Sequence, residues 1–198
     1  PVMRSFYVAA SEVRIETAMR PCEDLVIVRL PSGYTRPRRD LLRDATDRWG
    51  PLKTAIPGVR MTLDALQQFS RDLLVICHWR IVLGALAYRR DYYDPGLLKM
   101  TDVGVVLRRL GLGTALVQAA IRVACEQRRG ITLNPIDDAA RAFFARWGMH
   151  ERREGDQVHL ELSADEVHAL AEKGPSIPLV DEPPLPDRSG SGTGGTFR

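Results

Sequence analysis

The sequence predicts a single α/β domain with a mixed, mostly antiparallel central sheet flanked by helices, followed by a flexible C-terminal tail. The 198 residues are 44% hydrophobic, which suits one compact domain with a sizeable core. Aliphatic runs of strand length alternate with amphipathic segments along most of the chain. From residue 174 onward Pro, Gly and Ser dominate, and such a composition buries too little apolar surface to become ordered.

This change in composition divides the chain into three parts. Residues 1–21 form an N-terminal extension, in which the alternating pattern at 5–9 predicts an edge strand. Residues 22–173 form the folded domain, and residues 174–198 form the Pro/Gly/Ser-rich tail.

The first half of the domain predicts a strand, two helices and a hairpin. Residues 24–30 form an aliphatic run of strand length, and a proline in the first turn opens a helix over 37–48. Residues 62–69 show the spacing of a short amphipathic helix. Two apolar runs, 73–78 and 81–88, are joined by only two residues, which predicts an antiparallel hairpin.

The second half predicts a turn, two strands and two helices. An Asp-Pro-Gly sequence places a turn at 92–96, and a valine-rich strand follows over 97–107. Residues 111–128 carry apolar side chains on one broad face and predict the longest helix. A short buried strand at 131–133 and an amphipathic helix over 137–147 come next.

The domain closes with a hairpin and a final helix. Strands 149–153 and 158–162 flank a Glu-Gly pair, which predicts the hairpin turn. Ser163, with Glu166 three residues later, forms a capping box that predicts a helix start.

The turn between the valine-rich strand and the longest helix predicts an anion site. Gly111 and Gly113 have no side chains, so their backbone N–H groups can approach a phosphate closely. The helix start adds unpaired N–H groups and a positive dipole end, and Arg108 and Arg109 add full charges. The segment is not a Rossmann dinucleotide-binding motif, because Leu116 occupies the position of the third glycine. It is not a Walker A motif either, because no Gly-Lys-Ser/Thr is present. The whole segment comprises Arg108, Arg109, Leu110, Gly111, Leu112, Gly113 and Thr114.

A second motif follows in residues 140–149, which read Ala-Arg-Ala-Phe-Phe-Ala-Arg-Trp-Gly-Met. It resembles the A-x-x-F-Y-x-x-x-G-F motif of the GCN5-related N-acetyltransferase (GNAT) family. The strand and turn before it resemble that family's acyl-coenzyme A loop, Gln/Arg-x-x-Gly-x-Gly/Ala, with Arg108, Gly111 and Gly113 at the specified positions. The element order is also similar, and the resemblance covers roughly residues 22–162.

The resemblance implies that acetyl-CoA, or another short acyl-CoA, donates an acyl group to a primary amine of a small molecule or peptide. Direct attack within a ternary complex is the implied mechanism, so catalysis consists mostly of positioning. The implied donor-binding residues are Val103 and Val105 along the pantetheine arm, the segment 108–114 at the pyrophosphate, and Asn134, Ala140 and Phe144 beside the thioester.

Phe144 departs from the family pattern, which usually has a tyrosine that protonates the leaving thiolate. Another acid, a slower enzyme, an inactive chain or an engineered change would each explain the phenylalanine. A thiol with a pKa of about 8.5 leaves tolerably well without an acid. Asp102 is a candidate base and Tyr93 a candidate phenol donor, although a solvated strand acid and a packed aromatic explain them equally simply.

Other functions remain as alternatives to an active acetyltransferase. One is a weak or silent CoA-binding module, another a toxin-like acetyltransferase that acts on aminoacyl-tRNA, and a third an interaction protein that uses its tail. The net charge is only +3, and acids interleave with the arginines of 36–48 at helical spacing, so nucleic acid is not favoured. An exposed edge strand or the closing hairpin would allow a homodimer.

The sequence also predicts where the protein works. Three cysteines, Cys22, Cys77 and Cys125, lie far apart, which argues against a disulfide framework or a zinc site. The sequence begins without a signal-peptide pattern, and no apolar run approaches the ~20 residues of a membrane span. We therefore expect a cytoplasmic protein without membrane or metal.

Overall fold

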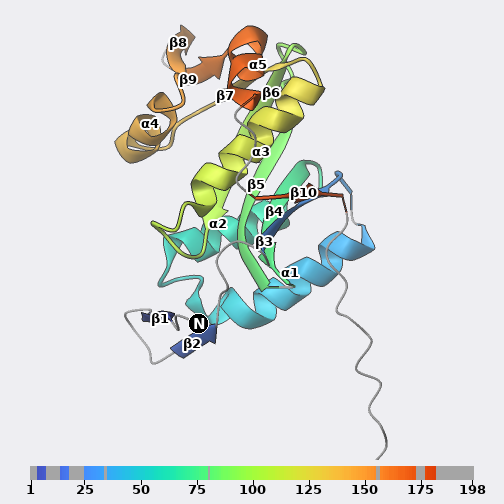
Figure 1. The fold of residues 1–198 in the computed structure, drawn as a ribbon, viewed down its shortest axis with the longest axis vertical. Helices are drawn as coiled ribbons and strands as arrows, with labels where there is room; N and C mark the ends of the chain where they lie inside the picture. The colour runs from blue at the N-terminus through green and yellow to red at the C-terminus, as the bar shows by residue number, and fades with distance from the viewer. Residues whose placement is uncertain are drawn as a thin grey trace, which may run out of the picture.

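A computed structural model describes residues 4–7, 14–17, 25–33, 35–79, 81–154, 157–172 and 177–181 (Figure 1). Within these residues a mixed sheet of eight strands runs in the order β10-β3-β4-β5-β6-β7-β9-β8. Only the β10–β3 and β6–β7 pairs of this sheet are parallel, which confirms the predicted mixed and mostly antiparallel sheet. The strands are β3 (Leu25–Leu30), β4 (Asp72–His78), β5 (Ile81–Arg90), β6 (Leu97–Val105), β7 (Gly130–Leu133), β8 (His150–Glu154), β9 (Gln157–Leu162) and β10 (Leu179–Val180).

Helices pack against the sheet and complete one continuous hydrophobic core. The longest helix of the described chain, α3, contacts β4, β5 and α5, and its apolar face is fully buried. The second helix, α2, lies directly on β5 and β6. The helices are α1 (Arg36–Trp49), α2 (Pro57–Leu66), α3 (Leu112–Glu126), α4 (Asp138–Ala145) and α5 (Ala164–Ala171), with a short 3-10 turn at Gly50–Leu52.

The helix predicted at 62–69 actually begins at Pro57 and ends at Leu66. Pro57 occupies the first helical position, where its missing N–H costs nothing. Gly58 follows it inside the helix because a Cβ there would collide with the carbonyl oxygen of Val105. Gly104 of β6 makes the reciprocal approach, because its Cβ would collide with the backbone of Met61 and Thr62. Paired glycines therefore bring α2 unusually close to β6.

The two ends of the chain differ from the prediction. A strand does form in the N-terminal extension: β1 (Arg4–Tyr7) pairs with β2 (Arg14–Thr17) in a separate two-stranded sheet and not with the main sheet. One edge of the main sheet is β10, which lies inside the predicted tail and pairs with β3. Ile177 is buried beside it, so residues 177–181 pack on the domain, while the other tail residues lie outside the described ones. Within the described part of the chain, no helix has the length and apolar character needed to cross a membrane.

Candidate active site

Strands β6 and β7 are paired over only three residues and then separate. Leu97, Leu98 and Lys99 pair with Gly130, Ile131 and Thr132. Beyond Lys99, β6 continues to Val105 beside β5, but no described strand pairs with its other side. The unpaired backbone N–H and C=O groups of such an edge can bind an extended ligand, as an added strand would.

A β-bulge lies where the two strands separate. Ala87 of β5 pairs with Asp102 and Tyr88 pairs with Met100, so Thr101 is the extra residue. Its hydroxyl donates a hydrogen bond of 3.1 Å to the carbonyl oxygen of Ala87. Because a bulge bends and twists the strand that carries it, Thr101 helps β6 to diverge from β7.

A pocket of about 110 Å³ occupies the gap between the separated strands. Most of its lining is apolar, and Asp102 is the only charged residue among the described residues that line it. Of the residues predicted from the sequence, Asp102, Val103, Asn134, Ala140 and Phe144 are brought together here. Its lining residues are Met61, Met100, Thr101, Asp102, Val103, Leu133, Asn134, Pro135, Ile136, Ala140 and Phe144.

Asp102 is held by an arginine that the sequence analysis did not single out. Nη1 of Arg71 lies 2.7 Å from Oδ2 of Asp102, and both side chains are about one-third exposed or less. The carbonyl oxygen of Arg71 in turn accepts a hydrogen bond of 2.7 Å from Nη1 of Arg38. Arg71 therefore fixes the position of the carboxylate, and Arg38 fixes the backbone that carries Arg71.

Arg38 is completely buried, which is rare for a charged side chain. Its Nε donates to the carbonyl oxygen of Leu66, and its guanidinium carbon lies 4.9 Å from the ring centroid of Phe69. Burial lowers the pKa of Arg38 from its ordinary value, although the charge of Asp72 opposes this effect. The loop between α2 and β4 is thus organised around a buried cation.

The predicted anion segment forms an open turn at the start of α3. Val106 makes a hydrogen bond to Leu83, and the chain then reaches Arg108 and Arg109, whose side chains are exposed. Gly111 is the N-cap of α3 with a φ of 77°, and no side chain caps the helix there. The first turn of α3 therefore offers backbone N–H groups and a positive dipole end next to two exposed arginines.

Phe144 fills one wall of the pocket and is 7% exposed. Its ring packs edge-on against Phe143 at a centroid distance of 4.9 Å. Asp137 caps α4 by accepting a hydrogen bond of 2.7 Å from the N–H of Ala140, which fixes the helix that carries both phenylalanines. Phe144 itself brings no proton donor to the pocket.

The structure places Tyr93 outside the residues that line this pocket, and its role as a phenol donor stays a prediction. Tyr93 is 89% exposed and belongs to the turn between β5 and β6. Tyr88 is buried instead, and burial raises the pKa of its phenol far above the ordinary value. Met61, Pro135 and Ile136 also line the pocket, and no pattern in the sequence singled them out.

The divergent parallel strands, the open strand edge and the uncapped helix agree with the fold that the sequence resemblance implies, that of the GCN5-related N-acetyltransferases. Solved structures agree with this assignment. The AtaTR complex bound with acetyl-CoA matches with a TM-score of 0.52 and 18% identity over 74% of this chain and 98% of that chain. The KacTA–DNA complex matches with a TM-score of 0.52 and 15% identity, over 75% of this chain and 99% of that chain. The third match is a tyrosine-to-phenylalanine mutant of the AtaT toxin, bound to the C-terminus of the antitoxin AtaR and acetyl-CoA. Its TM-score is 0.50, and it is 19% identical over 75% of this chain and 98% of that chain.

These identities are low, so the similarity establishes the fold alone. Comparison of the sequence with models of protein families gives no match, and comparison with curated proteins gives none.

Proposed function

We propose that the protein is an N-acetyltransferase that moves an acetyl group from acetyl-CoA to a primary amine by direct attack in a ternary complex. One observation carries the proposal: the unpaired edge of β6 runs from the pocket at Met100 toward the uncapped start of α3. An extended chain with amide groups at one end and a pyrophosphate at the other fits this path. The acetyl-CoA in the names of two structurally similar complexes supports the same donor.

The chain's own residues have distinct roles in this proposal. The backbone of Val103 and Val105 binds the pantetheine amides, and the segment 108–114 binds the pyrophosphate through its N–H groups and arginines. Asn134 and Ala140 lie beside the thioester. The bound thioester supplies an activated acetyl group.

In this proposal Asp102 accepts the acceptor's proton. A primary amine with a reference pKa of about 10.4 arrives as an ammonium and must lose a proton before it attacks. Asp102 is the charged group among the described residues lining the pocket, and Arg71 orients its carboxylate. Because Phe144 has no proton to give, the thiolate leaves without help from this position.

A second candidate is a toxin-like acetyltransferase that acts on aminoacyl-tRNA. The α-amino group of the aminoacyl end is a primary amine, so the same chemistry applies. The specific support is that the similar solved structures include the AtaT toxin in complex with its antitoxin. A silent CoA-binding module is the third candidate, and Phe144 is the residue that supports it.

Thermal-shift measurements with acetyl-CoA, CoA, NAD and ATP test the donor. Acetyl-CoA should raise the melting temperature, because a ligand at about 100 times its Kd adds about 2.7 kcal/mol of stability. Gly113→Val should abolish the shift: the site of its Cβ is open, 3.9 Å from Phe143, but the added methyl groups would cover the helix start. Ala145→Val, at an exposed position of α4, is the matched control and should keep the shift.

A shift by NAD or ATP alone would overturn the proposal. Release of CoA in the presence of simple primary amines then separates an active enzyme from a silent module. Aminoacyl-tRNA added to the same assay tests the second candidate.

A further inference from the structure

The turn between β5 and β6, residues 91–96, presents two tyrosines to solvent. Tyr92 is 80% exposed and Tyr93 is 89% exposed, so both rings are almost entirely free of the protein surface. They contact each other edge-on, with a centroid distance of 5.4 Å and an interplanar angle of 84°. Two neighbouring aromatic rings in water leave a substantial apolar area uncovered, which is typical of an interaction site. We call residues 91–96 the tyrosine turn.

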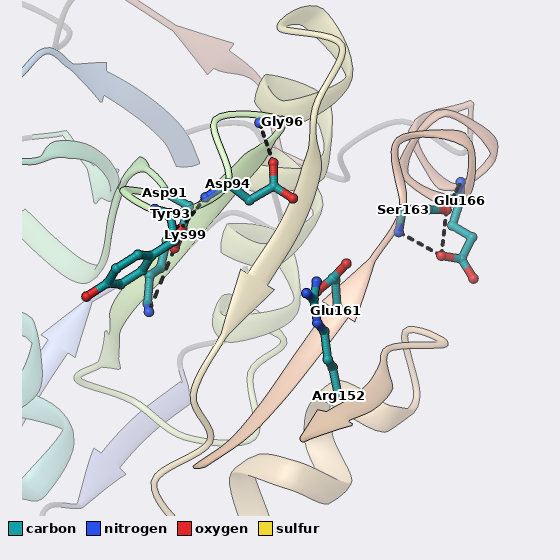
Figure 2. Close-up of polar contacts among 9 residues, drawn as sticks. All are labelled: Asp91, Tyr93, Asp94, Gly96, Lys99, Arg152, Glu161, Ser163 and Glu166. Atoms are coloured by element: carbon teal, nitrogen blue, oxygen red, sulfur yellow. Dashed lines mark hydrogen bonds and ion pairs between the residues drawn. The ribbon is translucent and has the colours of Figure 1, made fainter. Parts of the chain in front are cut away.

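The tyrosine turn is braced from within by carboxylates (Figure 2). Oδ1 of Asp91 accepts hydrogen bonds from the N–H groups of Tyr93, at 2.8 Å, and Asp94, at 3.0 Å. Its other oxygen lies 3.8 Å from Nζ of Lys99, and Asp94 accepts a hydrogen bond of 2.8 Å from the N–H of Gly96. The backbone that carries both rings is therefore fixed before any partner binds.

Asp91 is 8% exposed, so its charge is directed inward and not toward a partner. Burial alone would raise the pKa of Asp91. The two N–H donors and the charges of Lys99 and Arg89 outweigh burial and hold the pKa below its ordinary value. The carboxylate thus stays ionised and keeps the turn braced at neutral pH.

Basic residues come next to the tyrosine turn in two segments of the chain. Arg89 and Arg90 come directly before it on β5. Arg128 and Arg129 precede Gly130, whose N–H donates a hydrogen bond of 3.0 Å to the carbonyl oxygen of Gly96 at the end of the turn. Arg90 and Arg128 are exposed. The turn therefore combines rigid, exposed aromatic rings with cations brought from two separate segments.

We propose that the tyrosine turn is a docking surface for single-stranded nucleic acid. Unstacked bases would stack on Tyr92 and Tyr93, and Arg90 and Arg128 would bind the neighbouring phosphates. Aromatic platforms next to a basic track are how proteins bind single strands with little sequence preference, because every base has a π-face. A duplex hides its bases and cannot use the rings. This proposal does not depend on the chemistry of the pocket.

Fluorescence anisotropy with labelled single-stranded RNA and DNA of about 12 nucleotides, within the usual site size, tests the proposal. Binding is expected at about 50 mM salt and should weaken steeply toward about 200 mM. Tyr92→Ala with Tyr93→Ala should weaken binding about tenfold or more, whereas Tyr92→Phe with Tyr93→Phe should bind nearly as the wild type does. Arg90→Gln with Arg128→Gln should weaken all strands similarly and reduce the salt slope by about 1.4, because each phosphate contact to a single strand contributes about 0.7. Unchanged melting temperatures show that the exposed substitutions leave the fold intact.

Four outcomes would overturn the inference. They are no binding of either single strand at low salt, equal binding of a duplex, equal affinity of the double alanine variant, and binding of an acidic peptide in place of nucleic acid. Tighter binding of RNA or of DNA shows which of the two single strands this surface binds, and either result supports the proposed docking surface.

Discussion

Phe144 is the residue at which the site departs most clearly from its expected chemistry. Its ring keeps the shape of the pocket wall, yet it offers no hydroxyl to a leaving thiolate. Phenylalanine and tyrosine differ only by a hydroxyl group, so a substitution at this position can add a proton donor without changing the shape of the pocket wall.

We expect Phe144→Tyr to leave the affinity for CoA nearly unchanged and to raise the rate of acetyl transfer. A positioned general acid contributes about 10²–10⁴-fold at most, and less here, because the thiolate is already a fair leaving group. Calorimetry with CoA and the rate of CoA release measure the two effects. A large loss of CoA affinity would contradict the placement of Phe144 beside the thioester.

At the scale of residues, the family-like motifs of the sequence predicted much of the pocket lining. Asp102, Val103, Asn134, Ala140 and Phe144 line one pocket because the parallel pairing of β6 with β7 brings β6 beside the loop and the helix that follow β7. Arg71 was missed because it belongs to neither motif, and only the pairing of β4, β5 and β6 brings it to Asp102. Tyr93 lies in the turn between β5 and β6, outside the pocket lining, and its aromatic type alone could not place it relative to the pocket.

At the scale of elements, the prediction failed where tertiary contact overrode local preference. Helix α2 was placed too late because Gly58 is a poor helix former. The glycine is nevertheless required inside the helix, since only the absence of a Cβ allows the close approach to Val105. By contrast, the start of α5 was predicted correctly, because its capping box is a local signal.

We expect Ser163→Ala to lower the free energy of unfolding by about 1 kcal/mol, as is typical when an N-cap is lost. Ser163 accepts from the N–H of Glu166, and the Glu166 carboxylate accepts from the N–H of Ser163 (Figure 2). Urea unfolding measures the change, and Ser163→Thr is the control because it keeps the hydroxyl. Equal loss in both variants would contradict a capping role.

The same cap has a definite pH dependence. The backbone N–H and hydroxyl of Ser163 hold the pKa of Glu166 below its ordinary value of 4.5. The ionised Glu166 carboxylate therefore contributes its full stability above pH 4.5. This contribution is lost as the pH falls through the lower pKa that Glu166 has in the folded state. Ser163→Ala should accordingly cost less stability in acid than at neutral pH.

At the scale of the whole molecule, residues 177–181 belong to the fold although their composition predicted otherwise. Proline and glycine around them obscured a short apolar segment that buries Ile177 and pairs with β3. Composition averages over many residues, whereas two strand residues and one buried side chain are enough to anchor a segment.

We expect Ile177→Ala to lower the free energy of unfolding by about 2–4 kcal/mol, because it removes a buried side chain from the core. Ile136→Ala is the matched control: Ile136 is 75% exposed, and its loss should change stability by about 0.5 kcal/mol or less. Denaturant unfolding of both variants measures the difference. Equal and small effects would show that residues 177–181 do not contribute to the folded domain.

The pairing of β10 with β3 has a consequence for how the protein is made. Synthesis runs from the N-terminus at about 5–20 residues per second, so β3 emerges from the ribosome long before residues 177–181 exist. During that interval the outer edge of β3 has unpaired N–H and C=O groups, and such an edge can pair with a strand of a neighbouring nascent chain. Faster translation would therefore shorten the period during which the unpaired edge of β3 is exposed to neighbouring nascent chains.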